Sequence, residues 1–204
     1  MNVNGKPFRS IWLDRDGWSA AIIDQTRLPH EFLTRRLETP GDAAEAIRTM
    51  RVRGAPLIGA TAAYGIALAM RQRADDQALA EACRTLAATR PTAVNLNWAL
   101  SLMREALAPI APAQRMEAAY RLAADICDGD VATNRSIGEH GLGLIGELWD
   151  RRPDGVDVLH ILTHCNAGWL ATVDWGTVLA PVFLAHDAGI PVHVWVDETR
   201  PRNQ

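Results

Sequence analysis

The chain has 204 residues, of which 48% are hydrophobic, and a formal net charge of −3. This length suits one large domain or two small ones with a packed core. The basic side chains are scattered rather than gathered in a stripe, which argues against a nucleic-acid partner. The sequence also lacks both the roughly 18 consecutive apolar residues of a membrane span and the apolar run of a signal peptide at its start.

The cysteines give information about the cellular compartment. There are three, Cys83, Cys127 and Cys165, and none has C-x-x-C spacing. An odd number at these positions predicts neither a disulfide framework nor a zinc knuckle. We therefore expect a soluble protein of the reducing cytoplasm.

The first elements are expected to be short strands. Residues 10–13 and 20–24 are mostly apolar, and a polar turn that ends in Asp16-Gly17 separates them. This pattern predicts a β-hairpin. From Thr39 onward the pattern becomes helical, with Thr39 as the N-cap and Pro40 at the first helical position.

A long helical region is expected next. One helix should start near Pro56, and its Gly59 and Gly65 indicate close backbone packing. Apolar periodicity predicts further helices; these cover residues 74–89, 92–107, 112–128 and 130–149. Residues 1–150 are therefore predicted to form an α-rich N-terminal domain with a small antiparallel sheet.

The pattern changes near residue 155. A strand over residues 156–164, an apolar helix over 169–188 and a strand over 192–196 form a βαβ unit, which predicts a parallel sheet. Two parallel strands alone leave edges and a face uncovered. We therefore predict an α/β fold in which residues 151–204 begin a Rossmann-like domain that is incomplete in this chain and continues beyond it.

Cys165 is the first candidate for chemistry. It lies at the predicted carboxyl end of a parallel strand, where open α/β sheets bind ligands. The start of a helix just after it would favour a thiolate or a bound anion. The alternative is a small buried residue that ends a strand, and the residues alone leave both interpretations open. Cys83 and Cys127 lie in apolar helical patterns and are predicted to be core residues.

Two arginines stand directly before predicted helix starts. Arg53 precedes Gly54-Ala55-Pro56, a step that would expose free N–H groups beside a cation and so could hold a phosphate. An ordinary turn with a solvated arginine explains the same residues slightly better. Arg90, before Pro91, is a weaker signal of the same kind.

Two further patterns are set aside. Residues 141–146 match G-x-G-x-x-G, but no strand precedes them, so we interpret the glycines as helix packing. His160, His164 and His186 lack a convincing set of carboxylates or cysteines at ligand spacing. They are predicted to be core or site-lining residues, and no metal is expected.

Four ordered blocks carry a family resemblance that runs through essentially the whole chain. They are Val52–Gly59 with Ala62–Gly65, Asn134–Gly141, Thr163–Gly168 and Asp197–Pro201. Together they resemble the methylthioribose-1-phosphate isomerase family.

The resemblance implies an aldose–ketose isomerase of methionine salvage. Such enzymes convert 5-methylthioribose 1-phosphate into 5-methylthioribulose 1-phosphate without a metal or cofactor. Carried over by motif, Cys165 is one member of an acid/base pair, and its partner is an aspartate beyond Gln204. The implied substrate-binding residues are Arg53, Gly54, Ala55, Arg90 and Gln204. The chain alone is expected to be inactive without its C-terminal remainder, and a homodimer is expected.

Two relatives with the same fold remain as alternatives. One is ribose-1,5-bisphosphate isomerase, which should need extra basic residues for a second phosphate. The other is a non-catalytic regulatory subunit of a translation-initiation exchange factor, which the intact Arg-Gly-Ala-Pro and His-Cys-Asn-Ala-Gly blocks disfavour. A methylthio group should instead require an apolar pocket, which Trp98, Trp169 and Trp175 could line.

Overall fold

The chain begins with small antiparallel sheets. The computed structural model describes residues 1–197 and places β1 (Asn2–Val3) beside β2 (Lys6–Pro7). A second sheet has the order β3-β4-β5, from Ile11–Leu13, Ala20–Ile23 and Thr34–Leu37. The β3–β4 hairpin confirms the sequence prediction. The polar strand β5 was not expected, because its Thr-Arg-Arg-Leu sequence carries no apolar alternation.

Five helices follow before residue 151. They are α1 (Pro40–Arg48), α2 (Ala55–Gln72), α3 (Asp76–Ala87), α4 (Val94–Leu107) and α5 (Pro112–Asp150). As predicted, Thr39 caps α1 in a capping box: its hydroxyl accepts from the Asp42 backbone N–H, and the Asp42 carboxylate accepts from the Thr39 backbone N–H. The core forms around α2, in which every residue from Leu57 to Met70 is buried.

Glycines let the other helices approach α2 closely. A Cβ on Gly59 would lie 3.0 Å from the carbonyl oxygen of Asn95 on α4. A Cβ on Gly65 would lie 3.0 Å from both Ala43 on α1 and Leu86 on α3. The predicted close packing at both glycines is thus confirmed.

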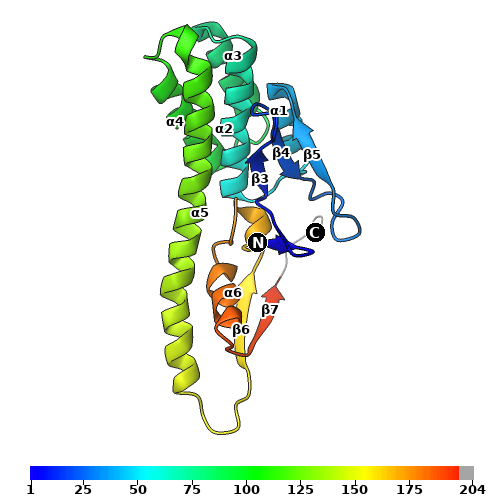
Figure 1. Cartoon of the computed structure of the whole chain (residues 1–204), viewed down its shortest axis with the longest axis vertical. Helices are drawn as coiled ribbons and strands as arrows, with labels where there is room; N and C mark the ends of the chain where they lie inside the picture. Colours follow the sequence, from blue (N-terminus) through cyan, green and yellow to red (C-terminus); the bar gives the residue numbers. More distant parts are fainter. Residues whose placement is uncertain (198–204) are drawn as a thin grey trace.

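The prediction of separate helices over 112–128 and 130–149 was wrong. Both belong to α5, a single helix of 39 residues that runs alongside the whole molecule in Figure 1. Gly129 at the predicted break has no atom within 4 Å of where a Cβ would be. A lone helical glycine costs only about 1 kcal/mol, which the packing of the two flanking stretches outweighs.

The last elements form a parallel unit beside the second half of α5. Strand β6 (Leu159–His164) pairs in parallel with β7 (Val192–Asp197), and helix α6 (Leu179–Asp187) connects them. The parallel pair was predicted. Gly141, in the G-x-G-x-x-G stretch, would carry a Cβ only 2.5 Å from Pro181 on α6, so its role in helix packing is confirmed.

The predicted helix over 169–188 is much shorter than expected. Residues Trp169–Ala171 form one 3-10 turn, η1, and α6 starts only at Leu179. Between them the chain makes a tight turn in which Gly176 has φ of 87° and would place a Cβ 2.3 Å from the backbone of Gly168. Within residues 1–197 we find no helix with the length and apolar character that a membrane crossing requires.

Candidate active site

Cys165 lies directly after the end of β6 and is exposed. Its φ of 65° is in the left-handed region, which is uncommon for a residue with a side chain. Its backbone N–H donates to the carbonyl oxygen of Asp197 at 2.8 Å. Two residues on, the carbonyl oxygen of Ala167 accepts from the Val178 N–H at 3.0 Å. The loop that carries the cysteine is therefore held by β7 on one side and by the turn before α6 on the other.

The start of α2 abuts this loop through Gly54. Gly54 is the N-cap of α2 with φ of 109°, and a Cβ there would lie 2.3 Å from the Cα of Ala171. Only glycine permits both this backbone conformation and this approach. The N-cap Gly54 makes no side-chain capping hydrogen bond, and the positive end of this 18-residue helix lies beside the cysteine loop, where it would favour an anion.

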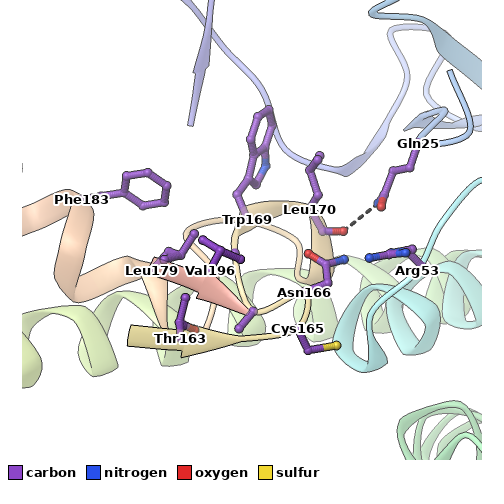
Figure 2. Close-up of a pocket in the computed structure, with 12 residues that line it drawn as sticks. Gln25, Arg53, Thr163, Cys165, Asn166, Trp169, Leu170, Leu179, Phe183 and Val196 are labelled. Carbon is purple, nitrogen blue, oxygen red and sulfur yellow. Dashed lines mark hydrogen bonds between the residues drawn. The ribbon is translucent and has the colours of Figure 1, made fainter. Parts of the chain in front are cut away.

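Arg53 and Cys165 line the same cavity, which has a volume of about 290 Å³. We call this cavity the Cys165 pocket. Figure 2 shows polar side chains, Gln25, Arg53 and Asn166, gathered at one side of it and the ring of Phe183 at the other. The described lining residues are Gln25, Arg53, Thr163, Cys165, Asn166, Ala167, Gly168, Trp169, Leu170, Leu179, Phe183 and Val196. Arg53 is the one cationic side chain among them.

Gln25 is a pocket residue that sequence reasoning missed. It follows β4 and is 1% exposed, and its backbone N–H donates to the Arg51 carbonyl oxygen at 2.9 Å. Its side-chain Nε2 donates to the carbonyl oxygen of Leu170 at 2.7 Å, across 145 residues of sequence. No local motif marks such a residue, because its position depends on tertiary contact. It ties the N-terminal sheet to the cysteine loop.

The other predicted binding residues are placed differently. Ala55 is the exposed first residue of α2, and Arg90 is half-buried ahead of α4. Neither is among the described residues that line the Cys165 pocket. Gln204 lies outside the described residues.

The three tryptophans proposed for an apolar pocket are also separated. Trp169 lines the Cys165 pocket, whereas Trp98 lines a second cavity of about 550 Å³ between α2, α4 and α5. Trp175 is not among the described residues of either cavity. The apolar side of the Cys165 pocket is made instead by Leu179, Phe183 and Val196, which the sequence did not single out.

The remaining cysteines have a different environment from Cys165. Cys127 is buried on α5, and burial raises the pKa of its thiol to about 12. Cys83 is half-buried against the core, and burial raises its pKa as well. Both match the predicted packing role.

The histidines were predicted to be core or site-lining residues, and this was wrong. His160, His164 and His186 are all exposed, and none lines the Cys165 pocket. His160 accepts a hydrogen bond from the Trp195 indole at 3.0 Å, and His164 lies beside Asp197. Within the part of the chain that the structure describes, no three His, Cys, Asp or Glu side chains gather as a metal site would require.

Comparison with known proteins gives a consistent family. The model of the Initiation factor 2 subunit family matches residues 51–204. Methylthioribose-1-phosphate isomerase from Rhodospirillum rubrum is 62% identical over 209 residues, covering 100% of this chain and 53% of the relative. The enzyme of the same name from Acidiphilium cryptum is 63% identical and covers 100% of this chain and 55% of its own length.

Two solved structures share the fold. The 5-methylthioribose 1-phosphate isomerase from Pyrococcus horikoshii has a TM-score of 0.81 and 36% identity, covering 96% of this chain and 54% of its own. The translation initiation factor eIF-2B subunit delta from A. fulgidus has a TM-score of 0.79 and 40% identity, covering 97% and 56%. The chain thus spans about half the length of the relatives that it matches.

Proposed function

Because this chain belongs to the Initiation factor 2 subunit family, we propose that its protein is an aldose–ketose isomerase acting on 5-methylthioribose 1-phosphate. The observation that carries the proposal is the Cys165 pocket, where an exposed cysteine and a buried arginine from distant parts of the sequence meet. Names of relatives at 62% and 63% identity support the same substrate. The product is then 5-methylthioribulose 1-phosphate, and the reaction belongs to methionine salvage.

The substrate sets the chemical problem. Its phosphate sits on the anomeric oxygen and blocks simple ring opening. The enzyme must therefore deliver a proton to the ring oxygen as the bond to C1 breaks, and then move hydrogen from C2 to C1. These steps require an acid/base pair in a pocket shielded from water. In this proposal Cys165 is one member of the pair, and an aspartate beyond Gln204 is the other.

The two sides of the pocket suggest how the substrate lies. Arg53 and the start of α2, Gly54 and Ala55, suit the phosphate and sugar oxygens. Leu179, Phe183 and Val196 suit the methylthio group. A sugar bisphosphate would need a second cation at this apolar side, and the described lining residues offer none there. Arg90 and Gln204 would complete the binding of the sugar.

The proposal extends to the organisation of the whole protein. We take residues 1–150 as an N-terminal domain and residues 151–204 as the start of a Rossmann-like catalytic domain, which the remainder of the protein would complete. The protein would be a cytoplasmic homodimer.

The test is isomerase activity of the full-length protein on 5-methylthioribose 1-phosphate. Cys165→Ser should lower kcat by about 10³-fold, since general acid–base catalysis contributes about 10²–10⁴-fold. Cys83→Ser is the matched control, because Cys83 is half-buried on α3 away from the pocket, and it should keep wild-type kcat. A folded full-length protein that does not convert this sugar would contradict the assignment and favour ribose 1,5-bisphosphate or a regulatory role.

A further inference from the structure

Asp197 contacts the base of the cysteine loop in two ways. In the parallel register His164 and Asp197 are the last paired residues of β6 and β7. The backbone carbonyl oxygen of Asp197 accepts the Cys165 N–H at 2.8 Å. Its carboxylate Oδ2 lies 3.2 Å from Nδ1 of His164, the residue just before the cysteine. One residue of β7 thus contacts both Cys165 and its neighbour.

These contacts act where the backbone is strained. Cys165 adopts φ of 65°, a conformation that costs a residue with a Cβ roughly 1–2 kcal/mol. Such a conformation persists only where the surrounding structure holds it. The Cys165 N–H can reach the Asp197 carbonyl oxygen only while the ends of β6 and β7 stay in register. The contact between the Asp197 carboxylate and the His164 imidazole joins the two strands by their side chains at this last register position.

The pair lies outside the Cys165 pocket. Thr163 and Cys165 line the pocket, whereas His164 and Asp197 are not among its described lining residues. This agrees with the alternation of side chains along a strand, which directs His164 to the other face from Thr163. His164 and Asp197 therefore contact the cysteine loop from behind and not from the substrate side.

We propose that Asp197 and His164 are positioning residues that hold Cys165 in its left-handed conformation and so fix the direction of its thiol. Their role in catalysis rests on the proposed isomerase function. The contact requires a proton on Nδ1 of His164, because an ionised carboxylate only accepts hydrogen bonds. The hydrogen-bond geometry of the pair, and not its charge, holds the conformation of Cys165.

The first experiment uses the full-length protein and its isomerase kinetics. His164→Ala and Asp197→Ala should each lower kcat about 10-fold to 100-fold with KM within about twofold, since misplacing a reacting group by about 1 Å can cost 10²-fold. His164→Asn and Asp197→Asn keep a donor and an acceptor at the same places and should stay within about threefold of wild type. The double alanine variant should be no slower than the slower single variant.

His193→Ala is the matched control. His193 is exposed on β7 and pairs with His160, four register positions before Asp197. Its removal perturbs the same strand pair away from the cysteine, and kcat should stay unchanged. If the asparagine variants lose as much activity as the alanine variants, the charge matters and positioning through the hydrogen bond is wrong.

A second readout does not depend on the reaction. The rate of iodoacetamide modification at Cys165, measured by mass spectrometry of its peptide, should change at least about threefold in the two alanine variants and not in the asparagine variants. Modification of buried Cys127 reports any unfolding. A protein without isomerase activity would overturn the proposed function, and this measurement would still decide the positioning role. Alanine variants with wild-type kcat and wild-type modification rates would overturn the inference.

Discussion

Helix α2 and the strand pair β6–β7 are both rich in apolar residues but differ in how they are buried. In α2 every residue from Leu57 to Met70 is buried, whereas Leu162 on β6 is 77% exposed and Trp195 on β7 is 53% exposed. Helix α2 is surrounded by α1, α3, α4 and α5. The β6–β7 pair is covered by α6 on one side. The comparison indicates that the stability of this chain resides in the N-terminal helices, and that the candidate site lies where the two regions meet.

The two regions should differ most in how much free energy of unfolding is lost when an apolar side chain is truncated in each. Ile66 on α2 is 0% exposed, and Ile66→Ala should cost about 4 kcal/mol because it leaves a cavity in a packed core. Leu162→Ala should cost less than about 0.5 kcal/mol, since the side chain is largely in solvent. Urea unfolding of the 204-residue chain measures both values. Equal losses would mean that the open face of the strand pair is covered in solution.

A smaller effect is expected at the junction of the two regions. Gly54→Ala should cost about 3 kcal/mol, because the new Cβ would meet Ala171 at 2.3 Å and because φ is 109°. Gly17 is the matched control: its φ is 77°, but no atom lies within 4 Å of the Cβ position. Gly17→Ala should therefore cost only about 1 kcal/mol.

Hydrogen exchange locates the effect of these glycine substitutions. Gly54→Ala should speed exchange in residues 165–178, while Gly17→Ala should leave that segment unchanged. Unchanged exchange in Gly54→Ala would show that the start of α2 does not hold the cysteine loop.

The smallest effect concerns a buried carboxylate of the N-terminal region. Burial by itself would raise the pKa of Asp24, but hydrogen bonds from Thr26 and Arg35 outweigh it and lower the pKa below 3.8. Asp24→Asn should cost about 2 kcal/mol at pH 7, as expected for a hydrogen-bonded charge. A carboxyl group whose pKa is lower in the folded than in the unfolded state stabilises the fold at pH values above its unfolded-state pKa. That stabilisation is lost as the pH falls through its folded-state pKa.

The difference in the free energy of unfolding between wild type and Asp24→Asn should therefore shrink as the pH falls from about 5 to about 2. Asp187→Asn, at an exposed position on α6, is the counterpart in the other region and should change the free energy of unfolding at pH 7 by less than about 0.5 kcal/mol. A constant difference for Asp24→Asn across this range would show that the carboxylate charge contributes nothing. Chemical denaturation at a series of pH values measures the free energy of unfolding of the wild type and of each variant.

Local signals predicted the elements that local interactions determine. The β3–β4 hairpin, the Thr39 cap and the helices through α4 follow from turn residues, capping and apolar period. The break placed at Gly129 was wrong because tertiary packing on both sides keeps α5 intact. The long helix placed over 169–188 was wrong because Gly176 turns back against Gly168, which apolar composition does not reveal.

In the candidate site, too, some residues could be predicted from local sequence signals and others depend on tertiary contacts. Cys165 and Arg53 could be proposed from their places beside a strand end and a helix start, and both line one pocket. Gln25 and Phe183 could not, because the first reaches the loop only through a tertiary contact and the second lies in an ordinary apolar helix. Sequence patterns singled out two residues that line one pocket, and the fold determines which other side chains line it with them.

Helix α5 has a mechanical consequence. At 39 residues it is about 58 Å long, since each residue adds about 1.5 Å. Its first half packs on α2 and its second half on α6, so it acts as a lever that joins the two regions. A bend of one degree near its middle would move its far end by about half an ångström, given a lever arm of about 30 Å. Gly129 lies just short of the midpoint of α5, and no atom lies within 4 Å of its Cβ position, so such a lever would flex there at least cost.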